Sequence, residues 1–502
     1  MRQPTHIPYP YLTYQYADIP QMIELCPAFK QYVNNINSFY WLFIEIAYCF
    51  SFPDCLYYSL ETKIEGSIIT LSVIILMLIC LLLFAAAYIF IPANKYKTVF
   101  IILIMISVAL RFAMVVYLYR NGADTFGTDG LVYHRLGIDI AKQLSDGVPF
   151  FSVKYTYTWY TVFIGLIYHI FGTDRYIASY INIAFAFASA LLLFKIALNR
   201  NYTFKNAACI SLAFLYFPNL FLWTTDTRKE AMLLFVCTLC LYTIQRFIIQ
   251  QTQAGGKIAK QAARIVLICF LLWFSTLIRI YMFVPLAAAV LTVQFLTYMK
   301  NRRRESLVFM AVVLTVTALT FLSTVYPLLG SYHAVMFPEQ SSKVSVDISN
   351  KVETVKLIAS NKNILLAAVN YILLPYPGNI NIKDIKGSNI LESVVSMDMM
   401  GWYACLILML SGIYSSIKRK EPYMLGLLAF LVTYVVINVP VVENVSDTIY
   451  RYRSVIVGIS LMFIDCDVIG RVFRRIEGIP DYTAGPKVKA GTYSSFSIKN
   501  NM

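Results

Sequence analysis

Carboxylates and other polar side chains gather in the segment NGADTFGTDGLVYHRLG, which separates long apolar runs. Its glycines and aspartates favour a turn, and the residues after Asp129 favour a helix that ends at Gly147. A carboxylate at a boundary between water and lipid can act as a general base when its neighbours position it. We therefore expect Asp129 to be catalytic, with capping of the helix as its alternative role. Three neighbours complete this candidate catalytic site: Asp124, Tyr133 and His134.

Three arginines near the ends of apolar runs have the chemistry to bind a phosphate. Arg279 interrupts a long apolar stretch, and Arg451 and Arg453 precede the last apolar run. A guanidinium group matches phosphate oxygens with two parallel hydrogen bonds. Snorkelling to the membrane interface is the alternative for Arg279, and an ion pair is the alternative for the other two arginines. The candidate partners for that ion pair are Asp129, Glu443 and Asp447.

A short turn within FPNLFLWTTDTRKEAML carries a further set of charges between two apolar runs. Its members are Asp226, Arg228 and Glu230. Glu230 begins a helix, where a negative charge interacts favourably with the helix dipole. The turn therefore has two possible roles, one in stabilising the helix and one in the site.

The elements that must position these residues are apolar helices. Hydrophobic residues make up 59% of the chain and charged residues only 14%, whereas about a quarter of a soluble protein is charged. A helix needs roughly 20 apolar residues to cross a hydrocarbon core of about 30 Å. We therefore expect an all-α, polytopic transmembrane bundle, because a β-barrel has short alternating segments in place of continuous apolar runs. Eleven runs are expected spans: 67–91, 98–119, 176–197, 207–225, 231–250, 265–278, 280–298, 306–326, 400–416, 422–440 and 454–470.

Basic residues flank alternate ends of these spans. They form six clusters: Lys95 and Lys97; Lys195, Arg200 and Lys205; Arg246, Lys257, Lys260 and Arg264; Lys300 and Arg302 to Arg304; Lys418 to Lys420; and Arg471, Arg474 and Arg475. This positive-inside pattern predicts that those ends are cytoplasmic, provided that 157–172 stays at the outer side without crossing. The outer segments are then 120–175, 226–230, 327–399 and 441–453, and each has as many acidic as basic residues. Although the net charge is +15, this distribution points to membrane lipids as partners and excludes nucleic acid.

The same pattern predicts how the chain is organised. Residues 1–66 form an N-terminal segment in which 38–60 is either a twelfth span or an interfacial helix. Residues 67–326 form a transmembrane core whose first outer loop, 120–157, is catalytic. The remaining parts are an outer loop with an amphipathic helix at 327–399, C-terminal spans at 400–470 and a cytoplasmic tail at 471–502. Most of the ten cysteines fall inside spans, so we expect neither a disulfide framework nor a zinc site.

The order of these parts resembles the GT-C class of membrane glycosyltransferases, such as the protein O-mannosyltransferases and the aminoarabinose transferases. The resemblance rests on TDGLVYHRLG, YTWYTVFIGLIYHIFG, FPNLFLWTTDTRKEAML, STLIRIYMF and a late RYR. It covers roughly 120–300 and 445–455. Many members of that class have a double proline where this chain has Tyr157 to Tyr160.

The resemblance implies an extracytoplasmic transfer of sugar from a polyprenyl-phosphate donor to a glycan, lipid or protein acceptor, with inversion at the anomeric carbon. Asp129 would then take the proton of the acceptor. Arg279, Arg451 and Arg453 would stabilise the leaving phosphate, where negative charge develops. No cofactor is required, although the acidic residues near Asp129 leave a divalent metal possible. We expect a multi-pass protein of a cell membrane, such as a bacterial inner membrane.

Two other functions fit parts of this pattern. A polymerase of lipid-linked oligosaccharide repeat units would use residues of 327–399 and nearby arginines. A transporter or flippase for a lipid-linked sugar would instead show repeated halves and charges near the middle of the membrane. Substitution of Asp129 separates the transferase from the polymerase, because only the transferase depends on this carboxylate.

Overall fold

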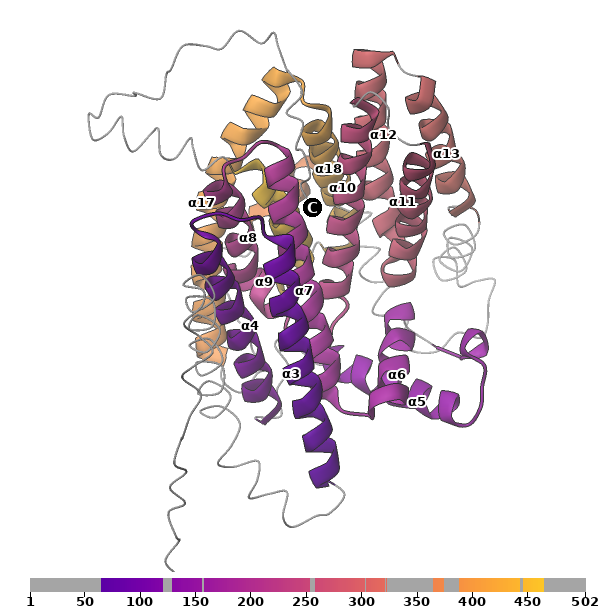
Figure 1. Cartoon of the computed structure of the whole chain (residues 1–502), viewed down its shortest axis with the longest axis vertical. Helices are drawn as coiled ribbons and strands as arrows, with labels where there is room; N and C mark the ends of the chain where they lie inside the picture. Colours follow the sequence, from indigo (N-terminus) through magenta and orange to yellow (C-terminus); the bar gives the residue numbers. More distant parts are fainter. Residues whose placement is uncertain are drawn as a thin grey trace, which may run out of the picture. The chain divides into compact units, whose positions relative to one another are not determined.

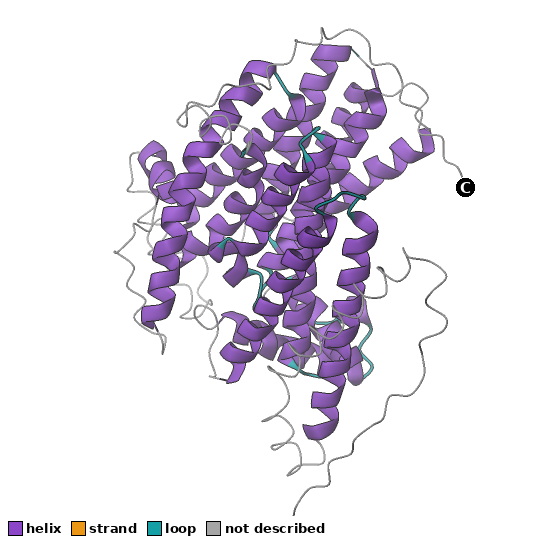
Figure 2. Cartoon of the chain, turned by 60° about the vertical axis from the view of Figure 1, so that its left-hand side comes forward, coloured by secondary structure: helices purple, strands orange, loops and turns teal. Residues whose placement is uncertain are grey.

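The structure is a computed structural model that describes residues 65–120, 129–155, 158–252, 258–302, 304–320, 322, 364–373, 388–442 and 446–464. Within these residues the regular elements are helices and no strand occurs (Figure 2), so the predicted all-α fold is confirmed. The described helices from Thr70 onward belong to one compact unit. The uncertain stretch 38–60 and the predicted tail 471–502 lie outside the described residues.

Figure 1 shows how the helices of the described residues are arranged. They are α3 (Glu65–Phe90), α4 (Lys97–Arg120), α5 (Asp129–Ser145), α6 (Trp159–Phe171), α7 (Arg175–Asn199), α8 (Phe204–Tyr216), α9 (Pro218–Trp223), α10 (Glu230–Thr252), α11 (Ile258–Ile278), α12 (Phe283–Asn301), α13 (Arg304–Thr320), α16 (Ile364–Leu373), α17 (Ser388–Arg419), α18 (Pro422–Val442) and α19 (Ser446–Ser460). Three short 3-10 helices join them: η1 (Phe150–Ser152), η2 (Ile280–Met282) and η6 (Leu461–Phe463).

Seven helices in the described part of the chain are long and apolar enough to cross a membrane. They include α4, α7, α10, α11, α12 and α18 and the segment of α17 from Asp398 onward. This is a multi-pass membrane protein by the length and composition of its helices. Shorter apolar helices lie at 74–90, 159–171, 204–216 and 305–320. The helix α6 has 13 residues and spans about 20 Å, which is too short to cross, as the positive-inside pattern requires.

The interior of the unit is built around α7, α10, α12 and α18. α7 packs against α10 on one side and α8 on the other, and α12 packs against both α18 and α13. Alanines on α7, including Ala178, Ala186 and Ala190, are fully buried, which lets neighbouring helices approach closely. Large exposed side chains in the middle of α17, such as Ile407 and Leu410, are apolar. Lipid is the solvent that suits such a surface.

The apolar run 207–225, expected to be one span, consists of two helices in the structure. α8 ends at Tyr216, and α9 begins with Pro218 at its first position. Proline has no N–H and its ring clashes with the preceding turn, so it breaks a helix but suits the start of a new one. The site turn around Asp226 follows α9 directly, so the break determines where that turn lies.

Two buried charged residues stabilise this break from opposite sides. The Arg111 guanidinium of α4 donates a hydrogen bond to the backbone carbonyl of Leu215 at 2.7 Å. The Asp398 carboxylate of α17 accepts one from the backbone N–H of Asn219 at 2.8 Å. Both groups satisfy backbone atoms that the break removes from the helical ladder, and such atoms are costly to leave unpaired in a membrane.

Two other expected boundaries differ. α17 begins at Ser388, inside the segment expected to be an outer loop, because the helix continues before the apolar run starts. Of the last expected span, 454–470, the structure describes the residues up to Ile464, in which α19 ends at Ser460 and η6 follows. Of the predicted amphipathic helix in 327–399, the structure describes α16, and the rest of that prediction lies mostly outside the described residues.

Candidate functional site

The helix α5 presents its first turn to the rest of the bundle because it packs closely on α6. Glycines make this approach possible: a Cβ atom on Gly165 would lie 2.3 Å from a side-chain atom of Ile140. The ring of Tyr133 packs edge-on against Tyr160 of α6, with 5.2 Å between ring centroids. The helix end at Gly147, with φ of +84°, agrees with the prediction from sequence.

His134 belongs to this same α5–α6 contact. Its Nδ1 lies 2.7 Å from the hydroxyl of Tyr168. Burial, assisted by the nearby Arg175, lowers the pKa of His134. The imidazole is therefore neutral at physiological pH and connects α5 to α6.

Asp226 is the centre of a buried polar cluster that we call the Asp226 cluster: Tyr119, Arg175, Ser179, Asn182, Asp226, Thr227 and Arg228. The Asp226 carboxylate accepts hydrogen bonds from the Tyr119 hydroxyl at 3.0 Å and the Thr227 backbone N–H at 2.6 Å. It also pairs with Arg175 and Arg228, each at 3.2 Å. Burial raises the pKa of Asp226, but the guanidinium groups of Arg228 and Arg175 outweigh it, so the pKa lies below its usual range.

The backbone of this turn is held by Asn182 of α7. Its side-chain amide contacts the carbonyl oxygens of Asp226 at 2.6 Å and Arg228 at 2.8 Å, and the Tyr160 hydroxyl at 2.9 Å. α5 also comes very close here, since a Cβ atom on Gly130 would lie 2.7 Å from Asp226 Oδ2. The Asp226 cluster thus positions the starts of both α5 and α10.

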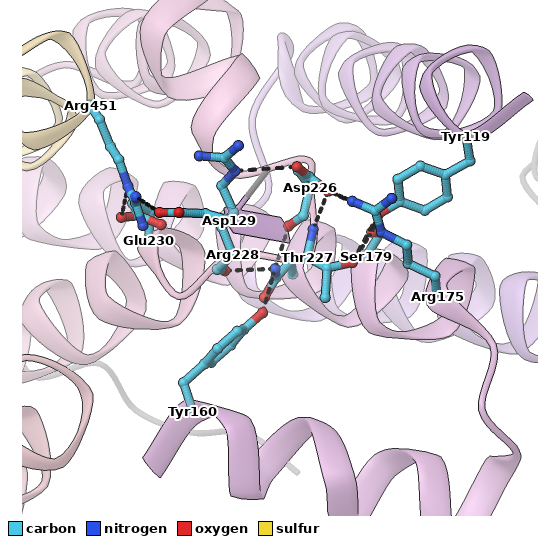
Figure 3. A network of polar contacts seen from close by, with 11 residues as sticks. Tyr119, Asp129, Tyr160, Arg175, Ser179, Asp226, Thr227, Arg228, Glu230 and Arg451 are labelled. Atoms are coloured by element: carbon cyan, nitrogen blue, oxygen red, sulfur yellow. Dashed lines mark hydrogen bonds and ion pairs between the residues drawn. The ribbon is translucent and has the colours of Figure 1, made fainter. Parts of the chain in front are cut away.

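A second group of charges lies beside the first, and we call it the Glu230 cluster: Asp129, Glu230, Arg279 and Arg451 (Figure 3 shows all but Arg279). Glu230 Oε1 accepts hydrogen bonds from Arg279 at 3.0 Å and from Arg451 Nε at 2.5 Å. Arg451 also donates through Nη1 to Asp129 Oδ2. One guanidinium group therefore bridges two carboxylates that are far apart in sequence.

These four residues come from four different elements. Asp129 opens α5 and Glu230 opens α10. Arg279 lies between α11 and η2 in an extended conformation, with φ of −152°, and Arg451 lies in α19. The packing of the helices brings these ends together. α10 packs against α7 and α19, and α19 also packs against α9.

The two carboxylates of the Glu230 cluster differ in how far their side chains are exposed. The side chain of Glu230 is fully buried, whereas that of Asp129 is 37% exposed. A general base must reach its substrate, so Asp129 is the carboxylate of this cluster that an acceptor can approach.

The neighbourhood is rich in cations. Burial lowers the pKa of Lys229 to about 7, and the positive charge of Arg279 adds to this effect. Burial alone would lower the pKa of Arg451, but Glu230 and its other neighbours raise it far above its ordinary value. Arg175, Arg228, Lys229, Arg279 and Arg451 face the carboxylates Asp129, Asp226 and Glu230. The two clusters together hold more cations than carboxylates, so they suit an anionic ligand.

Aromatic rings cover the guanidinium groups. The ring of Trp223 at the end of α9 lies 4.9 Å from Arg228 and 5.8 Å from Arg451. The Tyr452 ring lies 4.1 Å from Arg279. Cation–π contacts of this kind restrict how the guanidinium groups turn and keep water away from them.

The structure brings together part of the predicted site. Asp129, Glu230, Arg279 and Arg451 meet in one cluster, and Asp226 and Arg228 meet in the other. Arg453 is fully buried and contacts the Met399 sulfur of α17, and its charge, like that of Arg279, acts on Tyr371. Asp124 and Glu443 fall outside the described residues, as does the side chain of Asp447, whose backbone belongs to the first turn of α19. In the described part of the chain, no cluster of His, Cys, Asp or Glu is suited to a metal ion.

Five residues of the two clusters were not among the predicted site residues: Tyr119, Arg175, Ser179, Asn182 and Thr227. Lys229, which lies between Arg228 and Glu230 in the same turn, was not among them either. Arg175 and Lys229 carry a signal in the sequence, because each is a cation at the expected outer end of a span. Tyr119 and Asn182 carry none, since one tyrosine and one asparagine in an apolar run are common.

This arrangement offers an accessible carboxylate next to a set of fixed cations at one end of an apolar bundle. Such a site can take a proton from one group while it stabilises negative charge on another. No protein-family model, curated protein or solved structure matches this chain.

Proposed function

We propose that this chain is a membrane glycosyltransferase that moves a sugar from a polyprenyl-phosphate donor to a glycan, lipid or protein acceptor. The observation that carries the proposal is the ion pair between Asp129 and Arg451. It joins the most exposed carboxylate of the two clusters to a guanidinium group that is 14% exposed. The pair therefore combines a base and an anion-binding group in one accessible place.

In the proposed reaction, Asp129 takes the proton of an acceptor hydroxyl as its oxygen attacks the anomeric carbon of the donor. The new bond forms as the bond from that carbon to the phosphate oxygen breaks, and the lipid phosphate leaves with the electron pair. A single displacement of this kind inverts the anomeric carbon. The developing charge on the phosphate is stabilised by Arg451, as fixed cations do in a site that excludes water.

Arg451 also explains how Asp129 becomes a base when the donor arrives. The hydrogen bond from Arg451 occupies one oxygen of the Asp129 carboxylate. A phosphate that binds Arg451 competes with Asp129 for the same N–H groups. Donor binding thus releases the Asp129 carboxylate to act on the acceptor.

We place the site on the outer face of a cell membrane, such as a bacterial inner membrane. The support is the distribution of charge: the basic clusters occupy the other helix ends, such as the end of α12 at Lys300 and the end of α17 at Lys418. Positively charged ends remain in the cytoplasm. A lipid-linked donor is consistent with this face because it needs no soluble nucleotide there.

The direct test is transfer of radiolabelled sugar from polyprenyl-phosphate donors to lipid or glycan acceptors, with the protein in lipid nanodiscs. Asp129→Asn should abolish transfer and still bind the donor lipid. Asp139→Asn is the matched control, because it changes an exposed aspartate of the same helix and should leave transfer unchanged.

Other results would favour the other functions. Transfer that survives Asp129→Asn would remove the assigned base and favour a polymerase that uses residues of 327–399. Movement of the labelled lipid across the bilayer without transfer would identify a flippase. Loss of transfer in Asp139→Asn as well would show that any change in α5 disrupts the fold.

A further inference from the structure

Three buried polar atoms near the Glu230 cluster form no hydrogen bond within the described residues. They are Glu230 Oε2, Arg279 Nη1 and the Tyr371 hydroxyl. The side chain of Glu230 is fully buried, that of Arg279 is 4% exposed and Tyr371 is 2% exposed. A buried polar group without a partner is unfavourable, so three of them together indicate a place that is made for a polar ligand.

Tyrosine rings surround the Arg279 side chain. Its guanidinium group lies 4.1 Å from the Tyr452 ring and 5.7 Å from the Tyr281 ring. These two rings meet edge-on, with 6.5 Å between centroids. The Tyr434 hydroxyl donates to the backbone carbonyl of Tyr452 at 3.0 Å, which fixes that part of α19. The surroundings of Arg279 are therefore aromatic and rigid.

Tyr371 reaches this place from the long segment between α13 and α17. It belongs to α16, which packs against α18 and α19. The carbonyl oxygens at the end of α16 accept hydrogen bonds from Trp402 at 2.8 Å and Tyr403 at 2.7 Å, both on α17. The Tyr371 hydroxyl is close enough to the guanidinium groups of Arg279 and Arg453 for their charges to act on it, and Tyr281 and Tyr452 are also near it. α16 is thus anchored with Tyr371 beside Arg279.

The unpaired atoms restrict the chemistry of the ligand. A carboxylate oxygen accepts hydrogen bonds only, and a guanidinium nitrogen donates only. The ligand must therefore offer a donor to Glu230 and an acceptor to Arg279. An ionised phosphate diester has no donor for Glu230 Oε2. A hydroxyl group donates and accepts at once, as the Tyr371 hydroxyl also does.

We propose that Glu230, Arg279 and Tyr371 bind the hydroxyl groups of a neutral sugar, which lies against the rings of Tyr281 and Tyr452. The proposal rests on the transferase function and deepens it, because it names the residues that select the sugar. Arg451, which contacts the more exposed Asp129, then meets the phosphate. Arg279, expected from sequence to bind phosphate, is a sugar-binding residue in this assignment. The apolar faces of a sugar ring suit aromatic walls, and its hydroxyl groups satisfy the polar atoms.

The experiment measures binding of lipids to the protein in nanodiscs by native mass spectrometry. The probes are undecaprenyl phosphate and the same lipid carrying mannose, glucose, galactose or arabinose. The parent protein should bind at least one sugar-bearing lipid more tightly than the sugar-free lipid. Tyr371→Phe removes one hydroxyl and keeps the ring, so it should reduce that preference about three- to tenfold and leave the affinity for undecaprenyl phosphate unchanged.

Tyr423→Phe is the matched control. The Tyr423 hydroxyl is also buried and forms no hydrogen bond within the described residues, but it lies near Arg200 at the basic end of the bundle. This variant should keep the full preference for the sugar. Loss of the preference in both variants would show a general effect of removing hydroxyl groups and would overturn the proposal.

Two further outcomes would overturn it and leave the transferase function standing. In one, Tyr371→Phe binds each sugar-bearing lipid as the parent does. In the other, undecaprenyl phosphate binds but no attached sugar increases the affinity. Failure of the transferase function itself looks different: undecaprenyl phosphate does not bind to the parent protein and no sugar is transferred.

Discussion

Replacement of Glu230 by glutamine should destabilise the protein strongly, because Glu230 neutralises two buried guanidinium groups. Arg279 is 4% exposed, and Glu230 at 3.0 Å is its one ion-pair partner within the described residues. Arg451 retains its pair with Asp129. Removal of one partner from a buried ion pair typically costs about 3–5 kcal/mol, since it leaves an uncompensated charge. We expect a loss in this range for Glu230→Gln.

The measurement is equilibrium unfolding in mixed micelles with increasing amounts of dodecyl sulfate. The double variant Glu230→Gln, Arg279→Gln removes both members of the pair and should be more stable than Glu230→Gln alone. The coupling between the two sites should be about 2–3 kcal/mol. Arg419→Gln is the control, because Arg419 is 68% exposed and lies 3.6 Å from Glu421; an exposed pair contributes about 0–1 kcal/mol.

The reasoning is refuted if Glu230→Gln unfolds within about 1 kcal/mol of the parent. It is also refuted if the losses in the double variant are simply additive, since that result means that the two charges do not interact. A large loss for Arg419→Gln would show that the assay responds to any change of charge.

Three further substitutions test the Asp226 cluster and its surroundings. Gly130→Ala should cost about 1–3 kcal/mol of stability, because the added Cβ atom would lie 2.7 Å from Asp226 Oδ2. Gly401→Ala is its control, because a Cβ atom there meets no atom within 4 Å. The control should leave stability unchanged in the same unfolding assay. Asn182→Leu should cost about 1–3 kcal/mol, because it leaves buried carbonyl groups unpaired; an unchanged unfolding midpoint would contradict the role of Asn182 in holding the turn. Burial lowers the pKa of Lys229 from 10.5 to about 7. The unfolded chain therefore holds this proton more tightly than the folded protein does. Stability should rise as the pH increases from about 7 towards 10. Lys229→Met should reduce that rise, as thermal unfolding across this pH range would reveal, and a slope equal to that of the parent would disprove the assignment.

The fold class follows from the sequence because the apolar runs are long and the basic clusters alternate. A long helix of almost entirely apolar residues is stable in lipid. The sequence therefore predicts the bounds of α7, α10 and α12 within a few residues. The helix at 129–145 was predictable from its turn residues and from Gly147. Local signals are sufficient for elements of this kind.

The break between α8 and α9 shows where local signals fail. Pro218 is visible in the sequence, but the run 207–225 is apolar on both sides of it. The break is stabilised by Arg111 and Asp398, which come from α4 and α17. Only the packing of distant helices identifies these partners.

The candidate site was predictable as a set of residues but not as a set of contacts. Charged residues at the outer ends of spans are rare enough to single out Asp129, Glu230, Arg279 and Arg451. For Arg451 the sequence left a choice between phosphate and a carboxylate. Asp129 lies 322 positions from Arg451, and no rule of spacing connects residues at that distance. In the structure Arg451 pairs with Asp129 and also with Glu230.

The distance between Asn219 and Asp398 has a consequence for biosynthesis. The backbone N–H of Asn219 enters the membrane 179 positions before the carboxylate that accepts its hydrogen bond. During translation α8 and α9 are therefore made before the carboxylate that accepts this hydrogen bond. A buried hydrogen bond to the backbone is favourable in lipid. A chain that stalls before residue 398 thus contains the break between α8 and α9 but lacks the contact that Asp398 makes to it.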